Sequence, residues 1–191
     1  MKASGMNETN ARKMLTNRLE LIAANWDHVC AELEAPEHLA ALLKATVEPG
    51  WPPGEYDRDA QIFFRDRLRE GGLSVTGWYG WYALRRVNPD EPSVLVGAAG
   101  YIGPPDGAGA VEIGFSLMPA WQGLGYATEI CRALVENALA DARVKKVVAH
   151  AAPVNLASCR ELEKCGFRGA DIDEETGNKR FEILRGKIPG V

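Results

Sequence analysis

Apolar and polar residues follow short periods along the chain that predict both strands and helices. Residues 15–24 alternate around Leu19, Leu21 and Ala23, which predicts an opening strand. Residues 75–87 and 93–102 are rich in aromatic and branched side chains, and the turn formers between them predict an antiparallel pair. Residues 111–117, joined through GPPDGAGA, complete a three-stranded meander.

Helical spacing begins at three further places. PEHLAALLKATV, from Pro36, and DRDAQIFFRDRLRE, from Asp57, predict two helices separated by the irregular WPPGEY. From Ala127 the apolar period becomes about 3.6 residues, which predicts an amphipathic helix. The nearly all-apolar residues 145–152 then predict a buried parallel strand, and with it a right-handed crossover.

The last helix carries signals for both of its ends. Ser158 and Glu161 have capping-box spacing, and Asn155 is an alternative cap one turn earlier. Gly166 and Phe167 predict a Schellman closure, and KRFEILR predicts a final strand. The fold class is therefore α/β (α+β), with a mixed, mostly antiparallel sheet of about six to seven strands flanked by about four helices.

Composition narrows the class of protein. A length of 191 residues with 46% hydrophobic and 25% charged residues predicts one globular domain. We expect residues 1–14 to be a flexible leading segment and 15–191 to be the domain. No apolar run reaches the roughly 20 residues of a membrane span, and the polar amino terminus is unlike a secretion signal, so we expect a cytoplasmic protein without membrane contact.

Charge and cysteine spacing exclude further classes. A net charge of -4 with scattered basic residues gives no stripe for nucleic acid and favours a cationic partner. The four cysteines have no C-x-x-C spacing, so we expect reduced thiols and no metal.

Gly123 and Gly125 stand between the predicted strand at 111–117 and the helix from Ala127. A turn without side chains at a helix amino terminus exposes unpaired N–H groups and favours an anion such as phosphate. A tight turn without a ligand is the alternative. A dinucleotide fingerprint needs a third glycine where Thr128 stands, and a Walker loop needs Gly-Lys-Ser or Gly-Lys-Thr, which is absent.

EIGFSLMPAWQGLGYATE, followed about 30 residues later by NLASCRELEKCGF, resembles the GCN5-related N-acetyltransferase (GNAT) family and its branch of ribosomal-protein alanine and serine acetyltransferases. The resemblance covers residues 15–185 approximately. It implies a sheet splayed between two central parallel strands, here 111–117 and 146–152, with acetyl-CoA between them.

The resemblance also implies roles for individual residues. The backbone N–H groups of the glycine turn resemble those that bind the pyrophosphate in the family. The last residues of the preceding strand resemble those whose main chain hydrogen-bonds the pantetheine arm. Asn155 resembles the family's coenzyme-contacting asparagine, and Ala120 departs from the Gln or Arg of many relatives. The cradle residues are Gln122, Gly123, Leu124, Gly125, Tyr126 and Ala127, and the pantetheine partners are Phe115, Ser116 and Leu117.

Two candidate catalytic residues come from the same two strands, and a third comes from the last predicted helix. Glu112 is a lone carboxylate in an apolar strand and matches a glutamate that some relatives use as general base; a structural carboxylate is the alternative. His150 lies in another apolar run and is a second candidate base, or a structural histidine. Ser158 is placed by the resemblance near the coenzyme sulfur, although capping explains it. Leu162 stands where some relatives carry a tyrosine that acts as the general acid.

The acceptor pocket is expected in the first half of the chain. Trp51, Tyr56 and Asp57 are candidates for binding an ammonium group and its apolar neighbour, or they close the core. In GWYGWY, alternation predicts Trp78 and Tyr82 on one face and Tyr79 and Trp81 on the other.

Three functions stay open at this point. The favoured one is an N-acetyltransferase that moves the acetyl group of acetyl-CoA to a primary amine, either a peptide or a small molecule, as a monomer or homodimer. The second is an acyl-CoA-binding module without turnover, favoured by the missing tyrosine. The third is a nucleotide-dependent enzyme, which depends on the glycines alone.

Overall fold

The molecule is built on one mixed sheet with helices on both faces. The computed structural model describes residues 12–87 and 91–186. The strands are β1 (Lys13–Leu15), β2 (Leu19–Ala23), β3 (Ala45–Val47), β4 (Gly80–Arg85), β5 (Ser93–Tyr101), β6 (Ala110–Leu117), β7 (Lys146–Ala151), β8 (Arg168–Ile172) and β9 (Lys179–Leu184). The α-helices are α1 (Trp26–Glu34), α2 (Pro36–Leu43), α3 (Arg58–Gly71), α4 (Tyr126–Ala140) and α5 (Leu156–Lys164), with 3-10 turns η1 (Gly72–Val75) and η2 (Pro119–Trp121).

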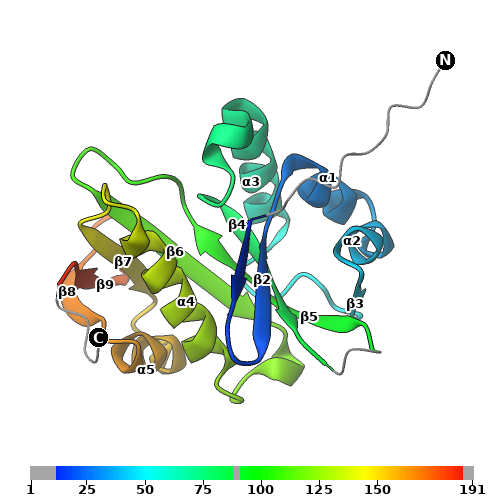
Figure 1. The fold of residues 1–191 in the computed structure, drawn as a ribbon. Coiled ribbons are helices and arrows are strands. Elements are labelled where there is room, and N and C mark those ends of the chain that lie inside the picture. The colour runs from blue at the N-terminus through cyan, green and yellow to red at the C-terminus, as the bar shows by residue number, and fades with distance from the viewer. Residues whose placement is uncertain (1–11, 88–90, 187–191) are drawn as a thin grey trace.

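Strand order along the sheet is β1-β2-β4-β5-β6-β7-β9-β8, and β3 pairs with β5. The β6–β7 and β3–β5 pairs are parallel, and the other pairs are antiparallel. The predicted fold class, including the central parallel pair, is confirmed. Figure 1 shows α1, α2 and α3 grouped over one end of the sheet and α4 and α5 over the other.

Two apolar clusters hold the helices to opposite faces. Ile130 and Leu134 of α4 are fully buried in the first cluster, together with residues of β6 and β7. Phe64 and Leu68 of α3 belong to the second, which also contains residues of α1 and α2. Burial of each such side chain contributes about 1.5–3 kcal/mol, so this packing fixes α4 against the two parallel strands.

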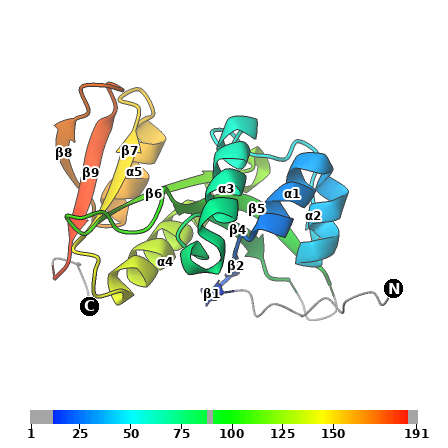
Figure 2. The same ribbon diagram turned by 90° about the horizontal axis from the view of Figure 1, so that it is seen from above.

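The central parallel pair is short, and its strands then part. Register pairs run from Ala110 with Lys146 to Ile113 with Ala149. Beyond them β6 continues beside β5 and β7 continues beside β9. Figure 2 shows the β7–β9–β8 group turned away from β4, β5 and β6. The parting leaves a fork between β6 and β7, as the resemblance predicted.

Two predicted elements in the first half were too long. Residues 15–24 do not form one strand: they contain the last residue of β1, a turn at 16–18 and the whole of β2, which pairs with β1 as a hairpin. The helix from Pro36 ends at Leu43, because Lys44 adopts a left-handed φ of 52° and β3 follows. β1 includes Lys13 and Met14; residues 1–11 of the predicted leading segment lie outside the described residues, so the boundary at residue 15 stays a prediction.

The predicted number of helices was one too low and the number of strands was too low. The sequence pattern did not predict α1, because two of its buried positions are the polar residues His28 and Glu32 and these interrupt the apolar period. Its capping box joins Asn25 to His28 instead of the usual Glu or Gln. β8 escaped because all of its residues are exposed, so its sequence RGADI has no apolar alternation.

α5 ends as predicted but begins with the alternative cap. The Asn155 side chain accepts from the N–H of Ser158 at 3.1 Å, so Asn155 is the N-cap and Ser158 is inside the helix. At the other end Gly166 has a φ of 91°, and the N–H of Phe167 donates to the Leu162 carbonyl at 3.1 Å. These bonds form the predicted Schellman closure.

Among the helices in the described ranges, none has the length and apolar character needed to cross a membrane.

Candidate active site

The fork between β6 and β7 brings both candidate bases together. Glu112 of β6 is in register with Val148 of β7, so its side chain lies on the same face as that of His150. His150 Nδ1 lies 2.8 Å from Glu112 Oε1, with side-chain exposures of 22% and 42%. With Nδ1–H donated to the carboxylate, Nε2 of the neutral ring carries the lone pair. The two side chains are therefore joined by a hydrogen bond and stay partly open to solvent.

Hydrogen bonds between β5 and β6 show which N–H and C=O groups of β6 point toward the fork. The main-chain carbonyl of Glu112 accepts from the N–H of Ile102, which follows β5. The main-chain N–H of Met118 donates to the carbonyl of Val96 in β5. Successive residues of a strand direct their main-chain groups to alternate edges. The groups of Phe115 and Leu117 therefore face the β7 side, whereas Ser116 faces β5. Beyond Ile113 no β7 residue pairs with them.

The glycine turn lies between β6 and α4, and its main chain is exposed. Gly123 and Gly125 have φ values of 73° and 81°, which favour glycine. A Cβ at Gly123 would have no neighbour within 4 Å, and one at Gly125 would meet Arg18 alone. Gly125 caps α4 without a side chain, so the first N–H groups of the helix have no side-chain acceptor among the described residues. This arrangement suits an anion.

Gln122 differs from the rest of the turn. Its N–H donates to the Pro119 carbonyl at 3.3 Å, inside η2. Its side-chain Nε2 donates to the Leu117 carbonyl at 3.0 Å. The available donors of the turn are therefore the N–H groups from Gly123 to Ala127.

The predicted acceptor residues have structural contacts. Trp51 Nε1 and the Tyr56 hydroxyl donate to the buried carboxylate of Glu32, as does the Tyr82 hydroxyl at 2.7 Å. Burial raises the pKa of Glu32, against the lowering effect of these bonds, and raises that of both phenols. Asp57 caps α3 by accepting from two N–H groups at 3.0 Å. Trp51 and Tyr56 therefore close the core, as the alternative held, whereas Asp57 is exposed and caps a helix.

The loop that carries them nevertheless lies against β6. A Cβ at Gly54 would be 2.8 Å from Ser116 Oγ, so the loop between β3 and α3 contacts the face of β6 that bears Glu112. Ser158 is half-buried in the first turn of α5, and its hydroxyl has no hydrogen bond to Glu112 or His150. The structure thus joins Glu112 to His150 by a hydrogen bond and shows no such bond between either of them and Ser158.

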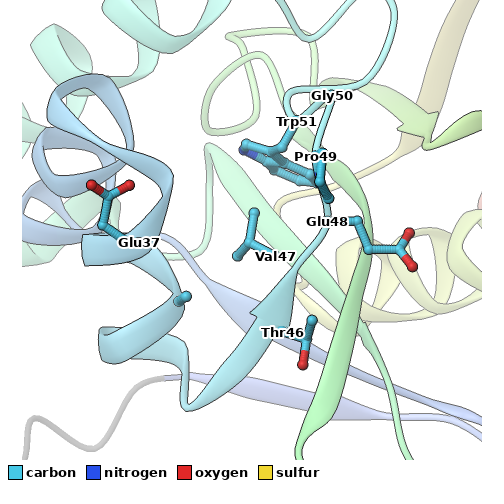
Figure 3. A pocket seen from close by; sticks show the side chains of 8 residues that line it. Glu37, Thr46, Val47, Glu48, Pro49, Gly50 and Trp51 are labelled. Carbon is cyan, nitrogen blue, oxygen red and sulfur yellow. The ribbon is translucent and has the colours of Figure 1, made fainter.

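Two cavities lie outside the fork. The larger, about 430 Å³, is lined by α2, β3 and the loop after β3, with Glu37 and Glu48 beside Val47 and Trp51 (Figure 3). It has no lining residue from β6, β7 or the glycine turn, so we do not assign the chemistry to it. The smaller, about 380 Å³, is lined by Asn17, Arg18, Arg85, Arg86, Val87 and Tyr126, and it adjoins the turn.

Sequence reasoning missed Arg18 and Glu32. Arg18 was read as part of a strand, and the hairpin turn that places it beside residue 125 has no local signal beyond Thr16 and Asn17. Glu32 lies in the unpredicted helix α1. In the parts of the chain that the structure describes, no cluster of three His, Cys, Asp or Glu residues is arranged to hold a metal ion.

Comparisons with known proteins agree with this geometry. A family model described as an acetyltransferase (GNAT) domain matches residues 24–168. An uncharacterized N-acetyltransferase, YjdG, of Bacillus subtilis (strain 168) is 28% identical over 152 residues, 80% of this chain and 87% of that protein.

Solved structures share the fold at low identity. A putative ribosomal-protein-serine acetyltransferase from Vibrio cholerae has a TM-score of 0.62 at 15% identity, covering 91% of this chain and 97% of the other. The spermidine N-acetyltransferase from Vibrio cholerae, in complex with CoA and spermine, has a TM-score of 0.62 at 16% identity, covering 90% and 98%. The chain belongs to the GNAT acetyltransferase family and is an acetyltransferase.

Proposed function

We propose that this acetyltransferase moves the acetyl group of acetyl-CoA to a primary amine by direct attack at the β6–β7 fork. The observation that supports this most is the fork itself. On one edge it has main-chain groups of Phe115 and Leu117 without a strand partner, and on one face it has the Glu112–His150 pair. A thioester and a base are both needed for amine acylation, and the fork offers main-chain groups for the first and a hydrogen-bonded carboxylate–imidazole pair for the second.

The coenzyme is assigned to the open main chain. In this proposal the N–H groups from Gly123 to Ala127 hold the diphosphate, and Phe115 and Leu117 bond the pantetheine arm. An N–H of that edge also polarises the thioester carbonyl; loss of one such donor costs about 2.7–4 kcal/mol in other enzymes. The side-chain oxygen Oδ1 of Asn155 caps α5, which leaves the side-chain nitrogen Nδ2 for the coenzyme. Acetyl-CoA supplies the acetyl thioester.

The Glu112–His150 pair is assigned the role of removing a proton from the acceptor amine. An ammonium group has no lone pair, so the amine must lose a proton before or during attack. His150 Nε2 takes this proton directly or through water, while Glu112 holds Nδ1–H and stabilises the imidazolium that forms. The amine nitrogen bonds to the acetyl carbon, the carbon–sulfur bond breaks, and the second proton that the nitrogen must lose passes through solvent to the thiolate. Ser158 remains a weaker candidate for assisting the sulfur.

The acceptor is assigned only as a primary amine. One structural neighbour is named as a spermidine enzyme and another as a putative ribosomal-protein-serine enzyme, so small amines and peptide amino termini both belong in the test. The negative net charge of the chain favours a cationic acceptor. A cytoplasmic monomer or homodimer completes the proposal.

A coupled assay of thiol release tests it. Purified protein is mixed with acetyl-CoA and a panel of polyamines, small primary amines and amino-terminal peptides, and free CoA is followed with a thiol reagent. Amine-dependent release that is lost in His150→Gln, with coenzyme affinity unchanged, supports the proposal. Saturable CoA binding without release for any amine would instead favour the acyl-CoA-binding module, and absence of CoA binding would refute both.

A further inference from the structure

Three arginines meet beside the glycine turn, although they lie far apart in sequence. Arg18 comes from the turn between β1 and β2, and Arg85 and Arg86 come from the end of β4. They line the 380 Å³ cavity with Tyr126, the first residue of α4, and within residues 12–87 and 91–186 no acidic residue lines it. Among the described residues Arg85 and Arg86 have no carboxylate partner in an ion pair. The cavity is therefore a cationic recess at the amino terminus of α4.

Arg18 is held in one orientation in this recess. Its Nε donates to Glu129 Oε2 at 2.8 Å, and its Nη1 donates to the Leu124 carbonyl at 2.9 Å. The guanidinium carbon lies 4.2 Å from the centre of the Tyr126 ring. These contacts reduce the side-chain entropy that a new contact would cost.

One nitrogen of Arg18, Nη2, has no hydrogen-bond partner among the described residues and faces the turn. Nη2 lies 3.4 Å from the position that a Cβ on Gly125 would occupy, which is the open side of the turn. The segment AWQGLGYA, residues 120–127, contains no basic side chain. Any side-chain charge at the turn must therefore come from another part of the chain, and Arg18 is placed to supply it.

We propose that Arg18 is a coenzyme-binding residue whose Nη2 donates to the diphosphate held by the glycine turn, with Arg85 adding positive potential from the recess. The inference rests on the proposed function, because it needs the diphosphate at the turn. Glu129 fixes the guanidinium. Although partial burial alone raises the pKa of Glu129, the bonds from Thr16 and from Arg18 together lower it, so the anchor is ionised at neutral pH. Arg18 thus joins the β1–β2 hairpin to the coenzyme.

Calorimetric titration with CoA tests this role. The Arg18 side chain is 45% exposed, so we expect loss of one screened, charge-assisted bond to raise the Kd for CoA about tenfold in Arg18→Gln. Arg18→Lys keeps the charge and should lose less. The same increase in both variants would overturn the role of the charge. Arg143→Gln, just beyond the other end of α4 and also ion-paired, is the matched control and should leave the Kd unchanged.

A donor without phosphates separates binding from folding. S-acetylpantetheine has the thioester and pantetheine arm but no diphosphate, so its KM should be equal in Arg18→Gln and the original protein. Equal losses for both donors would overturn the proposal, since they indicate a general disturbance of the site. An unchanged Kd for CoA in Arg18→Gln would also overturn it. If the original protein fails to bind CoA at all, the proposed function itself is wrong.

Discussion

The division of labour between Glu112 and His150 gives the sharpest prediction about the chemistry. If His150 is the base, His150→Gln should lower kcat by about 10²–10⁴-fold, the range for loss of a general base. Glu112 acts only through the ring. The 2.8 Å bond is charge-assisted, but the Glu112 side chain is 42% exposed, so solvent screening limits its contribution to about 1 kcal/mol. Glu112→Gln should therefore lower kcat only about fivefold.

The double variant makes the test independent of either magnitude. Because Glu112 acts through His150, the variant with both changes should be no slower than His150→Gln alone. The assay is thiol release at saturating acetyl-CoA, with the Kd for CoA measured in each variant as a control for folding. A larger loss in Glu112→Gln than in His150→Gln would refute the assignment and make Glu112 the base, and fully multiplicative losses would refute the claim that Glu112 acts through His150.

Three further predictions concern the turn, the α5 cap and the buried carboxylate. Gly125→Val should abolish CoA binding because its side chain fills the phosphate position, whereas Gly177→Val, with a similar φ of 69° and open space, should carry the same strain of about 1–3 kcal/mol and bind normally. Asn155→Ala should lose about 1 kcal/mol of unfolding free energy by denaturant titration, and Asn155→Asp should keep the cap but bind CoA more weakly, since it lacks the amide nitrogen. Folding raises the pKa of Glu32, so the stability that protonated Glu32 contributes is lost as pH rises from the unfolded-state pKa through the folded-state pKa. Over that pH window the difference in unfolding free energy between the original protein and Glu32→Gln should shrink. A difference that stays constant with pH would contradict the raised pKa of Glu32.

Elements of the proposed coenzyme site were predictable because their signals are local. The glycines of the turn, the cap and closure of α5 and the apolar run of β7 each depend on neighbours within a few residues. Glu112 and His150 were each found as an unusual polar residue in an apolar strand. Their hydrogen bond depends on the register of two parallel strands, which pairs Glu112 with Val148, and no local pattern encodes that register.

The predicted faces of GWYGWY were wrong for a related reason. Trp78 and Trp81 share one core cluster, and Tyr79 and Tyr82 share the other. Strict alternation fails because β4 begins only at Gly80, so the two residues before it do not follow strand geometry. Both faces are core, and none of the four rings lines the fork.

Residues that act through distant contacts were beyond sequence reasoning. Arg18 reaches the glycine turn only because β1 and β2 form a hairpin beside α4, more than 100 positions away in the chain. Glu32 collects donors from the loop after β3 and from β4. Such contacts follow from packing, and a single sequence shows only that an arginine or a glutamate is present.

A crystal structure with bound CoA tests the central claim most directly. We predict diphosphate oxygens within hydrogen-bond distance of the N–H groups between Gly123 and Ala127, Arg18 Nη2 beside them, and the pantetheine arm between β6 and β7. Coenzyme bound elsewhere, with water alone at the turn, would contradict the account.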